Sequence, residues 1–155
     1  MKVIFLDIDG VLNKENWMLE KTAWIDEEKL SMLSSVIKKT DAKIVMTSNW
    51  REIWNEPMFF TNNENGIFLG HKLFEKYGIP IIGFTEIFGK REDEIRKYLA
   101  DHKDIEKYAV LDDKDLTIDN FVRTDKRFGL TENEIINVLQ LLEKYTEEKT
   151  ERNKL

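Results

Sequence analysis

Pairs of polar residues directly follow three apolar runs of this sequence, and their types point to one kind of chemistry. Carboxylates crowded together repel one another unless a cation lies among them, and carboxylate oxygens with retained waters are what Mg²⁺ prefers. A bound Mg²⁺ with a nearby Lys or Arg would admit a phosphate, to which hydroxyls would donate hydrogen bonds. These residue types therefore indicate phosphoryl transfer, in which an aspartate can also act as nucleophile. The pairs are Asp7 and Asp9, Thr47 and Ser48, and Asp112 and Asp113.

The opening stretch, residues 1–13, carries the first pair. Residues 3–6 form a continuous apolar run, which is typical of a strand buried on both faces. Asp7 and Asp9 are two residues apart, so on extended backbone they point the same way, and Gly10 allows a sharp turn close to a ligand. The alternative is that the two aspartates are ordinary turn residues before a helix. The apolar residues on both sides of the motif favour the site.

The elements that must position these groups alternate between strands and helices. Such alternation predicts a parallel sheet with right-handed crossovers and helices on both faces, an α/β fold of the Rossmann-like three-layer type with a mostly parallel sheet. Ligands of such sheets bind at the carboxyl ends of the strands, so we expect the polar pairs to converge on one edge. We expect strands at 3–6, 42–46, 81–83, 108–111 and 121–122, and helices over 26–39 and 66–77 and beginning at 89 and 131.

Composition bounds the remaining possibilities. The chain has 155 residues, which suits one domain over 1–145 with a frayed polar tail at 146–155. Its net charge of -6 means that any contact with nucleic acid needs a local basic patch. The absence of cysteine excludes a thiol nucleophile, a thiolate zinc site and a disulfide-linked partner. With an early strand and no apolar run of about 20 residues, we expect a cytoplasmic protein without a secretory signal or membrane contact.

Four motifs, in order, resemble the haloacid dehalogenase-like (HAD) superfamily of phosphatases over nearly the whole chain. Short spacing between the first two motifs leaves no room for a large cap domain, so we expect a minimal cap or none. Segments 50–51, 82–85 and 129–131 also resemble a small, largely uncapped branch that includes domains associated with RNA-repair proteins. The motifs are Asp7-Ile8-Asp9-Gly10-Val11-Leu12-Asn13, the strand ending at Thr47 followed by Ser48-Asn49-Trp50-Arg51, Arg91-Glu92-Asp93-Glu94-Ile95, and Ala109-Val110-Leu111-Asp112-Asp113.

The resemblance implies a catalytic role for each motif. Asp7 would attack phosphorus, and Asp9 would protonate the leaving oxygen and then deprotonate the hydrolytic water. Thr47 would donate a hydrogen bond to a phosphoryl oxygen. The cation of the third motif would be Arg91 by its spacing to the following apolar position, with Lys90 as a close rival.

The resemblance also implies where a metal and a substrate would bind. Mg²⁺ would be held by Asp7, Asp113 and the backbone carbonyl of Asp9, with Asp112 as a second ligand or an orienting neighbour. Arg51 either reaches a phosphate or pairs with a neighbouring acid, and the residues alone do not separate these. The expected substrate-binding residues are Gly10, Thr47, Ser48, Asn49 and Arg51.

Our main hypothesis is a Mg²⁺-dependent phosphatase that acts on a nucleotide, a nucleic-acid end or another bulky phosphorylated substrate. The alternative is a non-catalytic module that binds a metal or a phosphorylated partner. A dehalogenase is disfavoured because a carbon–halogen bond does not need the proton-transfer residue Asp9. The four tryptophans are more consistent with packing than with base stacking, and we expect His71 and His102 at the surface.

Overall fold

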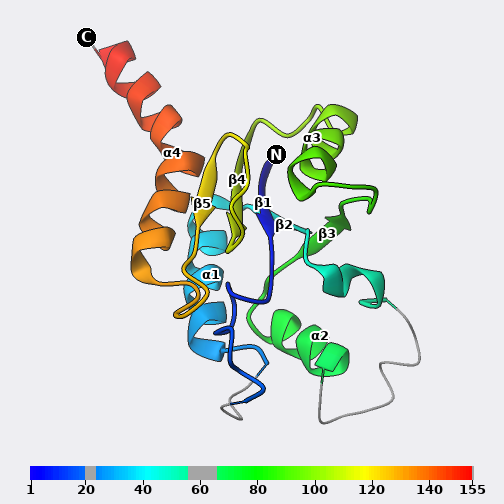
Figure 1. Ribbon diagram of the computed structural model, residues 1–155. Helices are drawn as coiled ribbons and strands as arrows, with labels where there is room; N and C mark the ends of the chain where they lie inside the picture. The colour runs from blue at the N-terminus through cyan, green and yellow to red at the C-terminus, as the bar shows by residue number, and fades with distance from the viewer. Residues whose placement is uncertain (20–23, 56–65, 155) are drawn as a thin grey trace.

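The computed structural model describes residues 1–19, 24–55 and 66–154. Its centre is one sheet of five parallel strands in the order β3-β2-β1-β4-β5 (Figure 1). The expected α/β architecture is confirmed, and each strand end lies within one residue of its expected position. The strands are β1 (Lys2–Leu6), β2 (Lys43–Met46), β3 (Ile81–Phe84), β4 (Lys107–Asp112) and β5 (Phe121–Arg123).

Four α-helices and one 3-10 turn accompany the sheet in the described chain. Helix α1 begins where expected, because the Asp26 carboxylate accepts a hydrogen bond from the Glu28 amide at 3.0 Å. Helix α3 begins two residues later than expected. There Glu94 Oε2 accepts from the amides of Phe88 and Gly89, which holds them in a loop. The helices are α1 (Glu27–Thr40), η1 (Asn49–Glu52), α2 (Gly66–Lys76), α3 (Arg91–Asp101) and α4 (Glu132–Lys154).

The carboxyl end of the chain differs from expectation. We expected a frayed end from residue 146, whereas helix α4 continues to Lys154. The segment is rich in Glu, Lys and Arg, which have high intrinsic helix propensity. The division into a domain of residues 1–145 and a polar tail stays a prediction.

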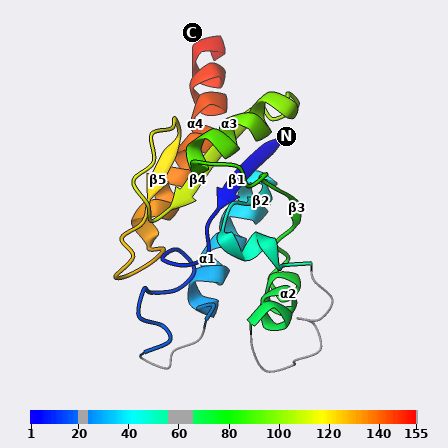
Figure 2. The same cartoon turned by 45° about the vertical axis from the view of Figure 1, so that its right-hand side comes forward.

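Both faces of the sheet are covered, as alternating side chains require. Val3, Phe5 and Val110 point to the face that α3 covers with Ile95. Residues of the opposite parity, such as Ile4, join the cluster formed with α1, α2 and α4. The three central strands β2, β1 and β4 are therefore buried on both sides. The molecule has three layers, with α3 opposite α1 and α4 (Figure 2).

No separate cap domain is present among the described residues. Helix α2 packs beside α1, where Ser34 Oγ donates a hydrogen bond to the Tyr77 carbonyl at 2.6 Å, and its Leu73 and Phe74 belong to the main core. The segments considered as a small cap, 14–25 and 52–80, fall partly outside the described residues. Among the described helices, none has the length and apolar character that crossing a bilayer needs.

Candidate active site

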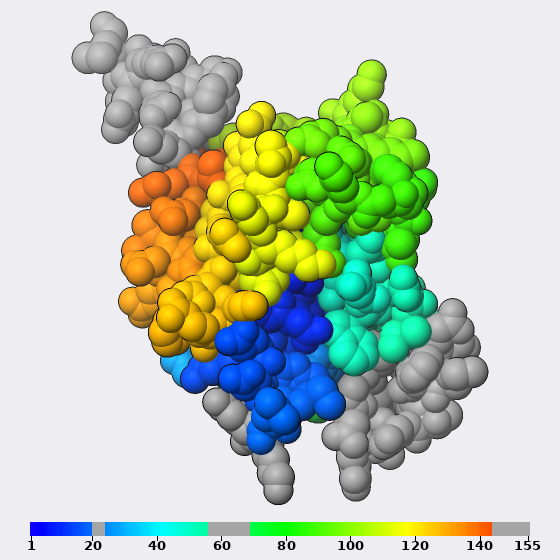
Figure 3. Space-filling model, in the orientation of Figure 1, coloured from blue at the N-terminus to red at the C-terminus, as the bar shows by residue number. Residues whose placement is uncertain are grey.

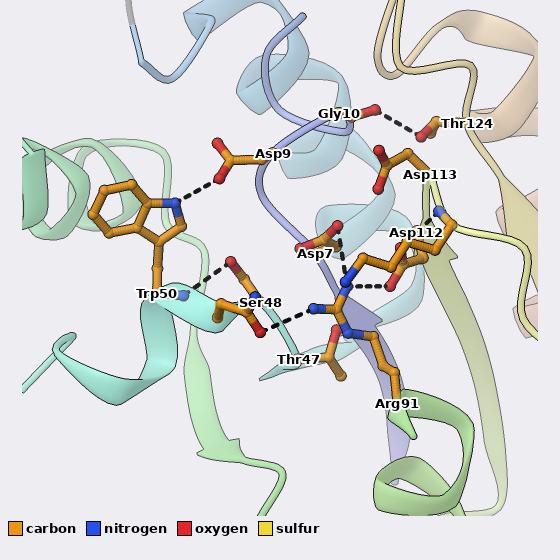
Figure 4. Close-up of polar contacts among 12 residues, drawn as sticks. Asp7, Asp9, Gly10, Thr47, Ser48, Trp50, Arg91, Asp112, Asp113 and Thr124 are labelled. Atoms are coloured by element: carbon orange, nitrogen blue, oxygen red, sulfur yellow. Dashed lines mark hydrogen bonds and ion pairs between the residues drawn. The ribbon is translucent and has the colours of Figure 1, made fainter. Parts of the chain in front are cut away.

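The acidic residues lie at the switch point of the sheet. Strand order reverses between β1 and β4, and such sheets bind ligands at this point, beyond the carboxyl ends of the strands. The pairing of β1 with β4 continues past the last residue of β1, because the Asp7 amide donates to the Leu111 carbonyl at 3.0 Å. Asp112 ends β4 and Asp113 follows it. The carboxylates of Asp7, Asp112 and Asp113 therefore lie together at the ends of the adjacent strands β1 and β4 (Figure 4).

These three carboxylates form a compact cluster. One oxygen each from Asp7, Asp112 and Asp113 lies within 4.8 Å of the other two. The side chains of Asp7 and Asp112 are buried, and that of Asp113 is half-buried. Burial first, and then the charge of Asp112, raise the pKa of Asp7 well above its usual range, and burial likewise raises the pKa of Asp113. An all-oxygen donor set whose members oppose one another's ionisation fits a divalent cation such as Mg²⁺.

Arg91, rather than Lys90, reaches the cluster. Its Nη1 lies 3.3 Å from Asp7 Oδ2 and 2.9 Å from Asp112 Oδ2, and its Nη2 donates to Asn49 Oδ1 at 3.3 Å (Figure 4). The Arg91 side chain is buried, so these contacts are weakly screened. Lys90 is exposed as the N-cap of α3 and forms no ion pair with any residue that the structure describes.

Thr47 presents a buried hydroxyl beside Arg91. Its amide donates to the Leu6 carbonyl at 2.9 Å, which fixes it at the end of β2 next to β1. Within the described chain its Oγ1 is buried without a hydrogen-bond partner, as are Thr85 Oγ1 and Trp24 Nε1. An unsatisfied buried hydroxyl costs about 1–3 kcal/mol, which a phosphoryl oxygen accepting its hydrogen bond would offset.

Asp9 lies apart from the three-carboxylate cluster. Its exposed carboxylate is turned toward Trp50: Oδ2 accepts from Trp50 Nε1 at 2.8 Å and Oδ1 accepts from Asn13 Nδ2 at 2.9 Å (Figure 4). Asn13 also donates to the Trp24 carbonyl and accepts from the Gly10 amide. Any part of Asp9 in metal binding would thus come from its backbone carbonyl. The anchoring by Asn13 was missed, although a short amide side chain in a turn often bridges nearby residues.

Gly10 allows the first motif to pass directly against Asp113. Its φ is +81°, and a Cβ built there would lie 2.4 Å from Asp113 Oδ2. Thr124 Oγ1 donates to the Gly10 carbonyl at 2.7 Å, so both backbone polar groups of Gly10 have protein partners. Gly10 therefore contributes close approach, and not a free amide, to the site. Thr124 was not foreseen because nothing local marks its contact with a residue 114 positions earlier.

Arg51 contacts groups inside the protein, and its placement in the substrate-binding set stays a prediction. Its side chain is buried and donates to the carbonyls of Thr47, Ser48 and Thr85. Its Nη2 also lies 2.8 Å from Glu94 Oε1, so the alternative of pairing with an acid is confirmed. The buried guanidinium therefore links the residues that follow β2 to the residue that follows β3.

Ser48 and Asn49 have structural contacts that leave their substrate role a prediction. Ser48 Oγ caps η1 by accepting from the Trp50 amide at 3.2 Å, and Asn49 orients Arg91. Their position beside the carboxylate cluster agrees with the expected site.

The tryptophans serve mainly as packing, as expected. Trp24 and Trp54 are buried, and the ring centroids of Trp24 and Trp50 are 4.8 Å apart. His102 is exposed as predicted. His71 is not simply a surface residue, because its ring is half-buried and stacks on Trp54 with centroids 4.6 Å apart.

Comparison with known proteins agrees with this geometry. Residues 3–135 match the family model described as the HAD domain in Swiss Army Knife RNA repair proteins. The chain belongs to this family. No curated protein and no solved structure matches it. The matched range runs from β1 into the first turn of α4, so this HAD domain includes all four motifs, and the expected superfamily and branch are confirmed.

Proposed function

We propose that this HAD domain is a Mg²⁺-dependent phosphoric monoester hydrolase that forms an aspartyl-phosphate on Asp7. A single observation carries the proposal. Asp7 belongs to the carboxylate cluster, and its Oδ2 also lies 3.3 Å from Arg91 Nη1. The proposed nucleophile therefore lies between acidic residues that could bind a metal and a cation that could bind a phosphate. The family assignment supports a phosphatase-type hydrolase fold.

The residues present fit a Mg²⁺ ion. Asp7 and Asp113 would hold it together with the Asp9 carbonyl, and Asp112 would be a further ligand or would orient Arg91, to which it is already bonded. The bound ion would neutralise developing charge and polarise phosphoryl oxygens. The raised pKa of Asp7 supports this assignment, because a buried nucleophilic carboxylate needs a neighbouring cation to stay ionised at neutral pH.

The chain's own groups account for both chemical steps. A carboxylate oxygen of Asp7 attacks phosphorus, and the bond from phosphorus to the leaving oxygen breaks as Asp9 supplies its proton. Water then attacks the phosphorus of the aspartyl-phosphate, gives its proton to Asp9, and releases phosphate and Asp7. Arg91 and Thr47 would bind the phosphoryl oxygens, which is consistent with the unpartnered Thr47 hydroxyl, and the exposure of Asp9 would let it exchange protons with solvent.

A site without a large cap would favour a bulky substrate. No cap domain is present among the described residues, so nothing there encloses a small sugar phosphate. The family description names RNA-repair proteins, and a phosphorylated nucleic-acid end or a nucleotide is the substrate class we propose.

Phosphate release tests the proposal. Aryl phosphate, nucleoside monophosphates and oligonucleotides phosphorylated at either end should release phosphate with Mg²⁺ and not with chelator. Asp7→Asn should abolish release, and Asp119→Asn, an exposed aspartate away from the cluster, should retain it. Undiminished activity of the Asp7→Asn protein would rule out the mechanism.

A non-catalytic module on the same fold is the second candidate. The observation in its favour is that Asp9 is tied to Trp50 and Asn13 and lies outside the carboxylate cluster. Stabilisation by Mg²⁺ without phosphate release from any ester of the panel would support it.

A further inference from the structure

A basic hollow of about 580 Å³ adjoins the carboxylate cluster and shares Asp113 with it. We propose that this hollow binds the sugar-phosphate backbone of a single-stranded nucleic acid whose terminal phosphate lies at Asp7. The inference rests on the proposed function and adds the surface that selects the substrate. The cations that line the hollow are Lys114, Arg123, Lys126 and Arg127.

The charge of the hollow is opposite in sign to the net charge of the chain. Its lining has four cationic side chains against two acidic ones, Asp113 and Asp125, in a chain whose net charge is -6. A concentration of cations on one face is what a polyanion needs from an acidic protein. Its volume lies within the range of ligand sites, about 300–1,000 Å³, and exceeds what one phosphate group fills.

The cations are available to a ligand. All four are exposed, and the ion pairs of Arg127 with Asp125, Lys126 with Glu15 and Arg123 with Asp115 lie at the surface. Lys114 forms no ion pair within the described part of the chain. Exposed ion pairs are weak and screened by salt, so phosphates can replace these carboxylates.

The hollow has a fixed position relative to the nucleophile. The Thr124 amide donates to the Asp112 carbonyl at 2.9 Å, and Arg123 Nε donates to the Asp113 carbonyl at 3.0 Å. Thr124 Oγ1 also binds Gly10 in the first motif. Figure 3 shows the surface after β4, in yellow, directly beside the dark blue surface of the first motif. A strand that ends at Asp7 can therefore continue over these cations.

An exposed aromatic ring beside the hollow favours nucleic acid over an acidic peptide. Phe128 is 54% exposed, and the guanidinium carbon of Arg127 lies 5.3 Å from its ring centroid. Surfaces that bind single strands combine cations along the backbone with aromatic rings on which bases stack. An acidic peptide would use the cations but would leave this ring without a partner.

The experiment compares substrates that differ only beyond the terminal phosphate. The test protein carries Lys114→Ala, Lys126→Ala and Arg127→Ala, and the matched control carries Lys38→Ala, Lys39→Ala and Lys103→Ala, which removes the same charge from other exposed positions. Phosphate release is measured from aryl phosphate, from RNA and DNA octanucleotides phosphorylated at either end, and from an acidic phosphopeptide. Anisotropy of labelled octanucleotides on the Asp7→Asn protein, with and without the three substitutions, gives binding without turnover.

We expect KM for the octanucleotides to be about tenfold higher in the test protein than in the unsubstituted protein. The value of kcat/KM for aryl phosphate should be the same in both. The slope of log binding constant against log salt should shrink by about 2, since each lost phosphate contact on a single strand removes about 0.7. Equal effects in the control protein, or an equal effect on the phosphopeptide, would overturn the inference. No phosphate release from any ester would overturn the proposed function, while the anisotropy would still decide whether the hollow binds the strand.

Discussion

Trp50 Nε1 donates a hydrogen bond to Asp9 Oδ2 at 2.8 Å. Asp9 lies in the loop after β1 and Trp50 in the turn η1 after β2, so this contact fixes the Asp9 carboxylate relative to the neighbouring strand. Trp50 is thus a positioning residue for the proposed acid and base.

Replacing Trp50 by Phe removes this hydrogen bond and keeps an aromatic ring against Trp24. We expect kcat to fall about tenfold and KM to change little, because the Asp9 carboxylate loses the contact that orients it. Steady-state kinetics with aryl phosphate would separate the two constants.

Trp54→Phe is the matched control, since Trp54 packs in the same aromatic cluster. It should lower the melting temperature and leave kcat unchanged. If Trp50→Phe changed only the melting temperature as well, the positioning role of Trp50 would be refuted.

Asp7 makes the metal-free protein sensitive to pH. Its pKa is raised by burial and by Asp112, so between about pH 3.9, the value in an unfolded chain, and the raised pKa the folded state binds more protons than the unfolded state. The contribution of Asp7 to the stability of the metal-free protein therefore falls as pH rises through that window. Thermal unfolding with chelator at a series of pH values, compared between the unsubstituted protein and Asp7→Asn, should show this decline, and Mg²⁺ should reduce it.

Asp7→Asn should remove most of that pH dependence. At pH 7 without metal we expect it to stabilise the fold by about 1 kcal/mol, as substitutions of strained site residues do, which raises the melting temperature by about 2–4 °C. The same substitution should lower phosphatase activity by at least about a thousandfold. A destabilised Asp7→Asn protein would contradict the raised pKa.

Most residues of this site could be predicted from the sequence, from its apolar periodicity and from the polar residues that follow the strands. Apolar runs that stop at Asp7, Thr47 and Asp112 predict both the strands and the edge where the side chains meet. The choice between Arg91 and Lys90 depended on where α3 begins. That point is set by Glu94 bonding to backbone amides upstream, a contact that no local pattern reveals.

The contacts that sequence reasoning left open or did not find join distant parts of the chain. Arg51 is 43 residues from Glu94, and the same residue types would serve equally well on a phosphate. Burial decides between these roles, and burial depends on how the β3–α3 loop packs over η1. Thr124 likewise follows a strand that was predicted only as an edge, so its contact with Gly10 had no local signal.

The Arg51–Glu94 pair should be a large contributor to stability and not to catalysis. Both side chains are 3% exposed, and removing one partner from a buried pair costs about 3–5 kcal/mol. Arg51→Met should lower the free energy of unfolding by that amount, measured by denaturant unfolding, while KM of the folded protein for aryl phosphate changes little.

Lys97→Met provides the comparison, because its pairs with Glu86 and Asp101 are exposed. It should cost less than about 1 kcal/mol. A large rise in KM for Arg51→Met, with stability preserved, would support Arg51 as a substrate-binding residue.

Alanine substitutions at Gly10 and Gly78 distinguish the effect of backbone strain from that of crowding at the proposed metal site. Both have positive φ, +81° and +66°, but a Cβ at Gly78 has nothing within 4 Å, whereas a Cβ at Gly10 meets the Asp113 carboxylate. Alanine at either position costs about 1–2 kcal/mol from the left-handed conformation. Only Gly10→Ala must also displace Asp113.

We therefore expect Gly10→Ala to lose about 100-fold in kcat/KM, since a displacement of about 1 Å in such a site has that effect, and to need more Mg²⁺ for half-maximal activity. Gly78→Ala should keep both values while losing a similar or smaller amount of stability. Titrating Mg²⁺ against phosphate release in the two proteins measures the difference. An unchanged Mg²⁺ requirement in a folded Gly10→Ala protein would mean that Asp113 does not hold the ion.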